Sequence, residues 1–201
     1  MKPWGFAVNG LVKVRRRRNK VIHPIRSHAA AAALAVLAML GAGLHAAPAS
    51  AAGASALTPL QRCQQGLAPN QSETVTHYGN QVGVSFPNVN NPYNAILPGD
   101  VVKVTVWGTV SYDLWGNSVG PNGNDIDAPS GWPFPGLNQY ASIARWNNNP
   151  GGWVGSPMQT NWLAGCNAAP SIAVRLLYYI NDGALWDNGG QWFIKTEVFW
   201  P

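Results

Sequence analysis

Hydrophobic and polar residues alternate most clearly along residues 101–112. Four valines at even-numbered positions share one face of this segment: Val102, Val104, Val106 and Val110. Lys103 and Thr105 take the opposite face. Because successive side chains of a strand point to opposite sides, this period of two predicts a β-strand with one face in the core.

Two later segments show the same alternation. Residues 171–181 place a row of apolar side chains on one face: Ile172, Val174, Leu176, Tyr178 and Ile180. Residues 191–200 turn Trp192, Ile194 and Val198 to one side, with Lys195 and Glu197 on the other. We expect both segments to be strands that bury their apolar faces.

The remaining pattern favours short strands joined by turns. Residues 73–78 and 81–86 flank a Gly-Asn pair and predict a hairpin, and residues 140–146 predict another strand. Residues 113–138 are rich in Gly, Pro and Asn and predict a long loop. No amphipathic helix is predicted. The sequence therefore indicates an all-β fold, a small two-sheet β-sandwich or jelly roll.

Charge is distributed unevenly along the chain. Eight of the thirteen Lys and Arg residues precede Ala52, including the run 15–18, whereas all eight acidic residues follow it. An apolar stretch at 29–44 and the small residues 49–51 come after the basic run. Basic start, apolar middle and small-residue exit predict a secretory signal peptide over residues 1–51, with 54–56 as a second possible cleavage site. An uncleaved membrane anchor is the alternative.

The remaining 150 residues have five basic and eight acidic side chains, a net charge of −3. We therefore expect a secreted protein that binds neither nucleic acid nor, once processed, a membrane. Residues 52–72 show weak periodicity and predict an N-terminal arm, followed by one domain over residues 73–201. Cys63 and Cys166 are the only cysteines, and in an exported chain they predict one disulfide; two free thiols are the alternative.

Oxygen-bearing side chains gather in one short loop between the last two predicted strands. Asp182, Asp187 and Asn188 lie within seven residues of one another. Carboxylate, amide and carbonyl oxygens are the ligands that calcium prefers. The sequence therefore predicts a calcium site here. The alternative is a tight hairpin in which Asp and Asn only bond their own backbone. Asp125 and Asp127 favour a solvated turn, and the alternative for them is a second metal site.

Ordered pieces of the sequence resemble the calcium-dependent galactophilic bacterial lectins of the PA-IL type. Leu97-Pro98-Gly99-Asp100-Val101 opens the valine-rich strand, which ends in Gly108-Thr109-Val110-Ser111-Tyr112. Gly120-Pro121-Asn122-Gly123 follows, and Tyr179-Ile180-Asn181-Asp182 then leads to Asp187-Asn188-Gly189-Gly190. The resemblance covers roughly residues 76–198 and implies a galactose-binding-like sandwich that holds one calcium ion among the loops at one end.

The resemblance also implies roles for individual residues. Calcium would be held by the backbone carbonyls of Tyr112 and Ala184 and by the side chains of Asp182, Asp187 and Asn188. The ligand loop, residues 182–188, is about two residues shorter than its counterpart in these lectins. A shift of one residue along it would instead place Asn188 and Gly189 in the last two ligand positions. Tyr112, Asp182, Gly183 and Asp187 would contact the sugar. The family's His and Gln, which recognise the galactose hydroxymethyl group, have no counterpart at 124–132, so the sugar is left open.

Aromatic side chains near the loop suit the apolar face of a pyranose ring, and Trp132, Trp115 and Trp186 are the candidates. We therefore expect a secreted, non-catalytic, calcium-dependent carbohydrate-binding protein that can form homo-oligomers. One alternative is a polysaccharide-acting enzyme with an acidic pair drawn from Asp125, Asp127, Asp182 and Asp187. A Ser-His-Asp enzyme would have to use His77, the sole histidine after residue 51. The other alternative is a structural sandwich with a vestigial site.

Overall fold

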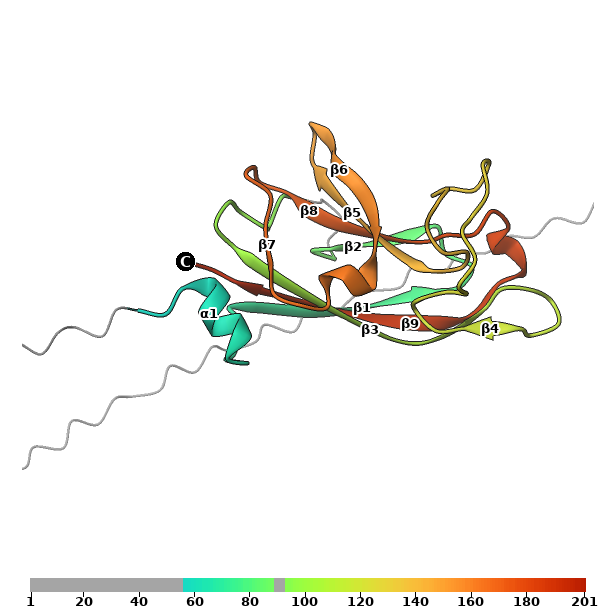
Figure 1. Ribbon diagram of the computed structural model, residues 1–201, viewed down its shortest axis with the longest axis horizontal. Coiled ribbons are helices and arrows are strands. Elements are labelled where there is room, and N and C mark those ends of the chain that lie inside the picture. Colours follow the sequence, from blue (N-terminus) through green and yellow to red (C-terminus); the bar gives the residue numbers. More distant parts are fainter. Residues whose placement is uncertain (1–55, 89–92) are drawn as a thin grey trace, which may run out of the picture. The chain divides into compact units, whose positions relative to one another are not determined.

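Two antiparallel sheets make up the fold in the computed structural model, which describes residues 56–88 and 93–201 (Figure 1). One sheet has the order β1 (Gln71–Tyr78), β9 (Gly189–Phe199), β3 (Val101–Ser111) and β4 (Ser118–Val119), with β7 (Asn167–Ala168) also paired to β3. The other has the order β2 (Gly83–Phe86), β8 (Arg175–Ile180), β5 (Ser142–Asn148) and β6 (Gly152–Gln159). The predicted all-β two-sheet sandwich is confirmed.

The core lies between the sheets and is formed by the alternating strands. The even-numbered valines of β3 face it, and Leu176, Tyr178 and Ile180 of β8 and Trp192, Ile194 and Val198 of β9 are buried there. The Tyr178 hydroxyl meets the Thr196 hydroxyl at 2.6 Å, so one hydrogen bond joins the two sheets inside the core. Ile172, predicted to face the core, is 46% exposed because β8 begins only at Arg175.

The predicted hairpin of residues 73–86 is wrong. All eight residues of β1 pair with β9, while β2 pairs with β8 in the other sheet. The turn at Gly79 and Asn80 is present, with the Gln81 amide donating to the Tyr78 carbonyl at 3.0 Å. It carries the chain from one sheet to the other, because the long β9 offers β1 a ladder twice the length of the four-residue β2.

The predicted arm contains a short helix that the sequence pattern did not indicate. This helix, α1 (Pro59–Gln64), starts with Pro59, and the Thr58 and Gln61 side chains cap its first turn reciprocally. Its Cys63 forms the predicted disulfide with Cys166, which is therefore confirmed. Cys63 packs with Val101 and Phe199, so α1 is fastened to the end of the sandwich away from the ligand loop.

The predicted signal peptide and its cleavage site at 49–51 lie outside the described residues. Within the part of the chain that the structure describes, no helix has the length and apolarity needed to cross a membrane. Two 3₁₀ turns complete the elements, η1 (Thr160–Leu163) and η2 (Leu185–Asp187).

Acid is expected to destabilise the fold through His77 on β1, whose side chain is fully buried. Burial lowers the pKa of His77 to about 4, against a smaller opposing effect of its hydrogen bond to the Gln81 carbonyl. The unfolded chain therefore takes up a proton on His77 near pH 6.5, whereas the folded chain takes it up only near pH 4. The free energy of unfolding thus falls by about 3 kcal/mol as the pH drops from 6.5 to 4. Urea unfolding in EDTA should show this loss when the protein is compared with His77→Gln, because the contributions of the other titrating groups cancel in that difference. Parallel curves for the two proteins between pH 4 and 7 would contradict it.

Candidate calcium and sugar site

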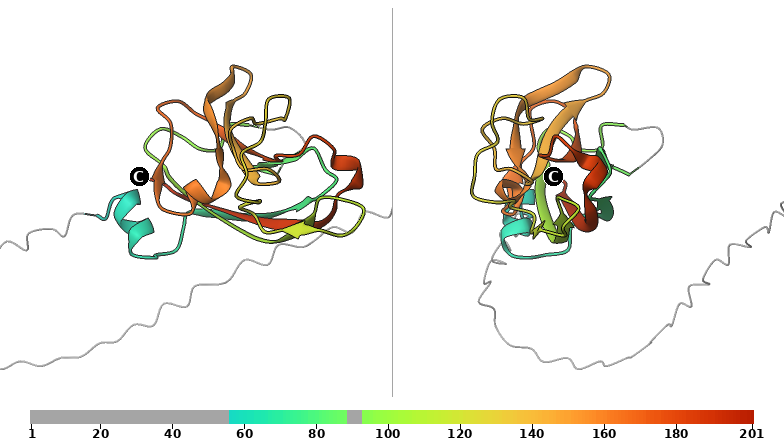
Figure 2. Two further views of the ribbon diagram at one scale, coloured as in Figure 1. Left: turned by 45° about the vertical axis from the view of Figure 1, so that its right-hand side comes forward. Right: turned by 90° about the vertical axis from the view of Figure 1, so that its right-hand side faces the viewer.

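The ends of β3, β8 and β9 meet three loops at the end of the sandwich that faces the viewer in the right-hand view of Figure 2. An open pocket of about 440 Å³ lies there. Its lining comes from the loops after β3 and β8 and from the long loop between β4 and β5: Tyr112, Asp113, Trp115, Trp132, Tyr140, Asp182, Gly183, Ala184 and Asp187. Six of these residues belong to the predicted site: Tyr112, Trp132, Asp182, Gly183, Ala184 and Asp187.

Asn181 links the end of β8 to the long loop. Its side chain is fully buried; its amide nitrogen donates to the carbonyls of Phe134, Leu137 and Asn138 at 3.0–3.2 Å, and its oxygen accepts the Phe134 amide at 3.0 Å. Its backbone carbonyl accepts the Tyr140 amide at 2.7 Å. One residue therefore fixes the loop that carries Trp132 and Tyr140 next to Asp182.

Three buried oxygen atoms of the ligand loop have no hydrogen-bond partner among the residues that the structure describes. Asp182 uses one carboxylate oxygen to accept the Ala184 amide at 2.9 Å, and its Oδ2 is left over. Asp187 Oδ1 and Asn188 Oδ1 are likewise buried and unpartnered. An unsatisfied buried polar group costs about 1–3 kcal/mol, more when it is charged, so three together call for an explanation such as an ion.

The orientation of Asn188 is set by the neighbouring turn. Its side-chain nitrogen donates to the Gly79 carbonyl at 3.2 Å, which leaves Oδ1 as the free end of the amide. Gly79 is close enough to the start of β9 that a Cβ there would collide with the Gly189 carbonyl oxygen. The close approach of this glycine thus allows Asn188 to be held in place.

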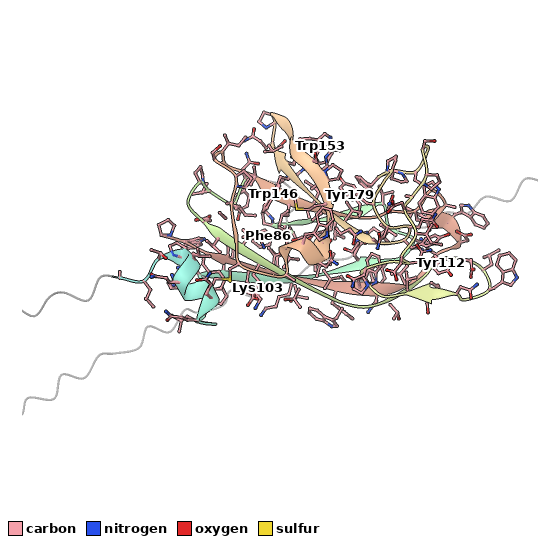
Figure 3. The ribbon with its side chains drawn as sticks, viewed as in Figure 1. Phe86, Lys103, Tyr112, Trp146, Trp153 and Tyr179 are labelled. Carbon is pink, nitrogen blue, oxygen red and sulfur yellow. A yellow bond between two sulfur atoms is a disulfide. The ribbon has the colours of Figure 1, made fainter. Side chains whose placement is uncertain are left out.

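Tyr112 lies opposite the ligand loop because β3 and β9 stay in register up to Ser111 and Gly189. Its ring stacks on Tyr140 with centroids 4.1 Å apart, and Trp132 meets Tyr140 edge-on at 5.2 Å. Tyr112 is labelled at this end of the sandwich in Figure 3. The three rings form an aromatic wall of the pocket, beside the acidic loop.

Sequence reasoning missed two residues that line the pocket, Asp113 and Tyr140. Tyr140 was assigned to the start of a strand, but β5 begins at Ser142, and Tyr140 has a positive φ of 60°. That strained conformation is uncommon for a bulky residue and turns the ring into the pocket. Burial raises the pKa of the Tyr140 phenol, and nearby charges, Asp182 first among them, raise it further. The local sequence Gln139-Tyr140-Ala141 contains no turn signal that predicts this conformation.

The other candidates occupy different positions. Trp115 lines the pocket but is 87% exposed, and Trp186 is 76% exposed beside it in η2. Asn188 is buried behind Asp187. Asp127 forms an isolated bridge with Asn138, away from the pocket lining. Over residues 56–88 and 93–201 no three His, Cys, Asp or Glu side chains cluster as metal ligands, so a cation here would depend on two carboxylates plus amide and carbonyl oxygens.

No protein-family model matches this chain, and no curated protein matches it significantly. What is established about its class therefore comes from the structure: an all-β two-sheet sandwich closed by one disulfide.

Proposed function

We propose that the protein is a calcium-dependent carbohydrate-binding protein whose ion and sugar share the pocket at the end of β3, β8 and β9. The observation that carries the proposal is the set of three buried, unpartnered oxygens of Asp182, Asp187 and Asn188. Hydrogen bonds with Ala184 and Gly79 already hold the Asp182 and Asn188 side chains, so two of the three free oxygens are held in position before a cation binds.

The chemistry of the donor set suits calcium. Two carboxylates balance the charge of a divalent cation, and the Asn188 amide and the carbonyls of Tyr112 and Ala184 would bring the protein ligands to five. Calcium takes six to eight oxygens, so one to three positions remain for water or sugar hydroxyls. The Asp187 and Asn188 pairing is favoured over Asn188 and Gly189, because Gly189 has no side chain to offer.

The rest of the pocket suits a pyranose ring. Tyr112, Tyr140 and Trp132 present aromatic surface for the apolar face of a sugar, and the acidic loop provides acceptors for its hydroxyl protons. Histidine and glutamine are absent from the described residues that line the pocket, so the identity of the sugar stays open, as the sequence left it.

The binding function is favoured over catalysis. His77 is fully buried inside the sandwich and bonds the Gln81 carbonyl, so it cannot serve as the base of a Ser-His-Asp enzyme. Asp125 and Asp127, one of the acidic pairs considered for a glycosidase, do not line the pocket.

Thermal unfolding tests the proposal. A ligand that binds only the folded state raises its melting temperature, so millimolar calcium should raise it and EDTA should reverse the rise. A panel of monosaccharides should then raise it further only when calcium is present. No response to calcium would favour a purely structural domain, and release of reducing sugar from a polysaccharide would favour an enzyme.

Replacing Trp132 by alanine is expected to weaken sugar binding about tenfold while leaving calcium affinity unchanged, because the ring supports Tyr140 rather than the cation. Trp162, which is 57% exposed on η1 and does not line the pocket, provides the matched control. Titration calorimetry at saturating calcium would measure both. Equal sugar affinity after loss of Trp132, Trp115 and Trp186 together would refute the aromatic contribution.

A further inference from the structure

A second concentration of aromatic and polar side chains lies on the outward face of the β2-β8-β5-β6 sheet. Cross-strand register places Trp153 opposite Asn147 and Asn147 opposite Arg175. Four residues further along β8, Tyr179 lies between Ile143 of β5 and Gly83 of β2. We call the outward side chains of Arg145, Arg175, Trp153 and Tyr179 the arginine face. Figure 3 labels Trp153 and Tyr179 on the upper sheet, apart from Tyr112.

Arg145 is held in place without a hydrogen-bond acceptor. Its guanidinium lies 4.1 Å from the centre of the Trp153 ring, and Trp153 meets Tyr179 edge-on at 6.3 Å. The pairing of β5 with β6 shifts register between Ala144 and Trp146, at Arg145 itself, and such irregularities re-aim a side chain. Its Nε is buried and unpartnered, and none of its N–H groups donates to an acceptor within the described part of the chain.

Charge on this sheet has one sign. The four strands contain two arginines and no Asp or Glu. Arg175 donates to the Asn147 side chain at 3.1 Å, which orients it beside an open pocket of about 390 Å³. That pocket is also lined by Tyr179, Leu177 and Ser85 and has no acidic lining residue. Two of the five basic residues after Ala52 therefore lie on one face of a domain whose net charge is negative.

We propose that the arginine face is a second carbohydrate-binding site, independent of calcium, that takes an acidic polysaccharide of the uronate type. A guanidinium fork matches a carboxylate in two parallel hydrogen bonds, and one already stacked on an aromatic ring loses little freedom on binding. Trp153, which is 47% exposed, and the half-buried Tyr179 supply apolar surface for the sugar rings between carboxylates. A neutral glycan could offer the buried Arg145 Nε only a hydroxyl or ring oxygen, a weaker acceptor than a carboxylate.

Phe134 adjoins both sites. Its ring packs against Tyr179 at 5.4 Å, and its backbone bonds the Asn181 side chain beside the calcium pocket. A polysaccharide chain that crosses Phe134 would reach from one site to the other. Two weak sites bridged in this way bind a polymer more tightly than either binds a short fragment.

Titration calorimetry with a galacturonic acid hexamer, in EDTA and about 100 mM salt, tests the arginine face without the calcium site. The unmodified protein should bind this acidic hexamer at least tenfold more tightly than the fully methyl-esterified hexamer, which has the same rings without charge. The double variant Arg145→Gln, Arg175→Gln and the single variant Trp153→Ala should each lose at least tenfold in affinity for the acidic hexamer.

The matched control removes two positive charges from the outward face of the other sheet. Lys103→Gln, Lys195→Gln should keep the affinity for the acidic hexamer within twofold. Equal losses in this control, equal binding of the esterified hexamer, or no binding of the acidic hexamer in EDTA would overturn the proposal. Arg175→Gln alone, which leaves the Arg145 and Trp153 stack in place, keeps the test valid should the double variant unfold. These outcomes are separate from the calcium-dependent melting test.

Discussion

Calcium affinity is expected to fall at least about 100-fold in Asp182→Asn, because the substitution removes the charge from an oxygen that has no other partner. In EDTA the same variant should be as stable as the unmodified protein or more so. The unbound protein carries two buried, unpaired carboxylate oxygens at Asp182 and Asp187, and neutralising one of them relieves part of that cost.

This pair of results separates the metal site from the alternative of a structural turn. If Asp182 served only to accept the Ala184 amide, calcium would have no effect on either protein, because the amide oxygen of an asparagine can accept the same hydrogen bond. Calcium titration followed by thermal unfolding measures both quantities on the same samples.

Asp113→Asn is the matched control for this substitution. Asp113 lines the same pocket, but its carboxylate is already engaged by the Asn117 side chain and by the amides of Trp115 and Asn117. These bonds lower its pKa, with the Asn117 side chain as the largest cause. Its removal should change calcium affinity by no more than a few-fold. An equal loss in both variants would indicate that only the general charge of the pocket matters.

Loss of the disulfide is expected to lower the melting temperature by about 8–20 °C. Cys63 and Cys166 are 103 residues apart in the chain. In the chain-entropy model, closing a loop of that length raises the free energy of the unfolded state by roughly 4–5 kcal/mol, because the unfolded chain loses conformational entropy. Cys63→Ser, Cys166→Ser avoids new thiol chemistry, and differential scanning calorimetry in EDTA measures the change.

Calcium affinity should survive the same double substitution. Figure 1 and the left-hand view of Figure 2 place α1 and the red turn of η2 at opposite ends of the sandwich. A calcium affinity that fell together with the melting temperature would contradict the separation of the two ends, and a shift of less than about 3 °C would contradict the entropic estimate.

Strands with regular alternation were predictable because burial imposes the period locally. The valines of β3 and the apolar residues of β8 and β9 take the faces expected from sequence. Each of these strands lies in one sheet and turns one face toward the other sheet, so every second residue is buried. Pairing partners were not predictable in the same way. Residues 73–86 have the pattern of a hairpin, yet β1 and β2 belong to different sheets, because the choice of partner depends on β9, more than 100 residues later.

The ligand loop was found from sequence because its oxygen ligands are close together in the chain. Tyr140 was not, because its position depends on contacts between distant residues. The Asn181 side chain reaches residues 43–47 positions earlier, and that set of hydrogen bonds turns the Tyr140 ring toward the acidic loop. The helix α1 was missed for a different reason, since six residues with a proline start are too short to show a period.

The position of β9 also determines when this sheet can form. It follows all the other described strands in the sequence, yet it lies between β1 and β3 and pairs with both along their lengths. Until residue 199 has been synthesised, β1 and β3 have no common neighbour, and their apolar faces and unpaired edges stay open to other chains. Assembly of this sheet therefore cannot be completed before β9 has been made, and a nascent chain that lacks β9 is the species most in need of a chaperone.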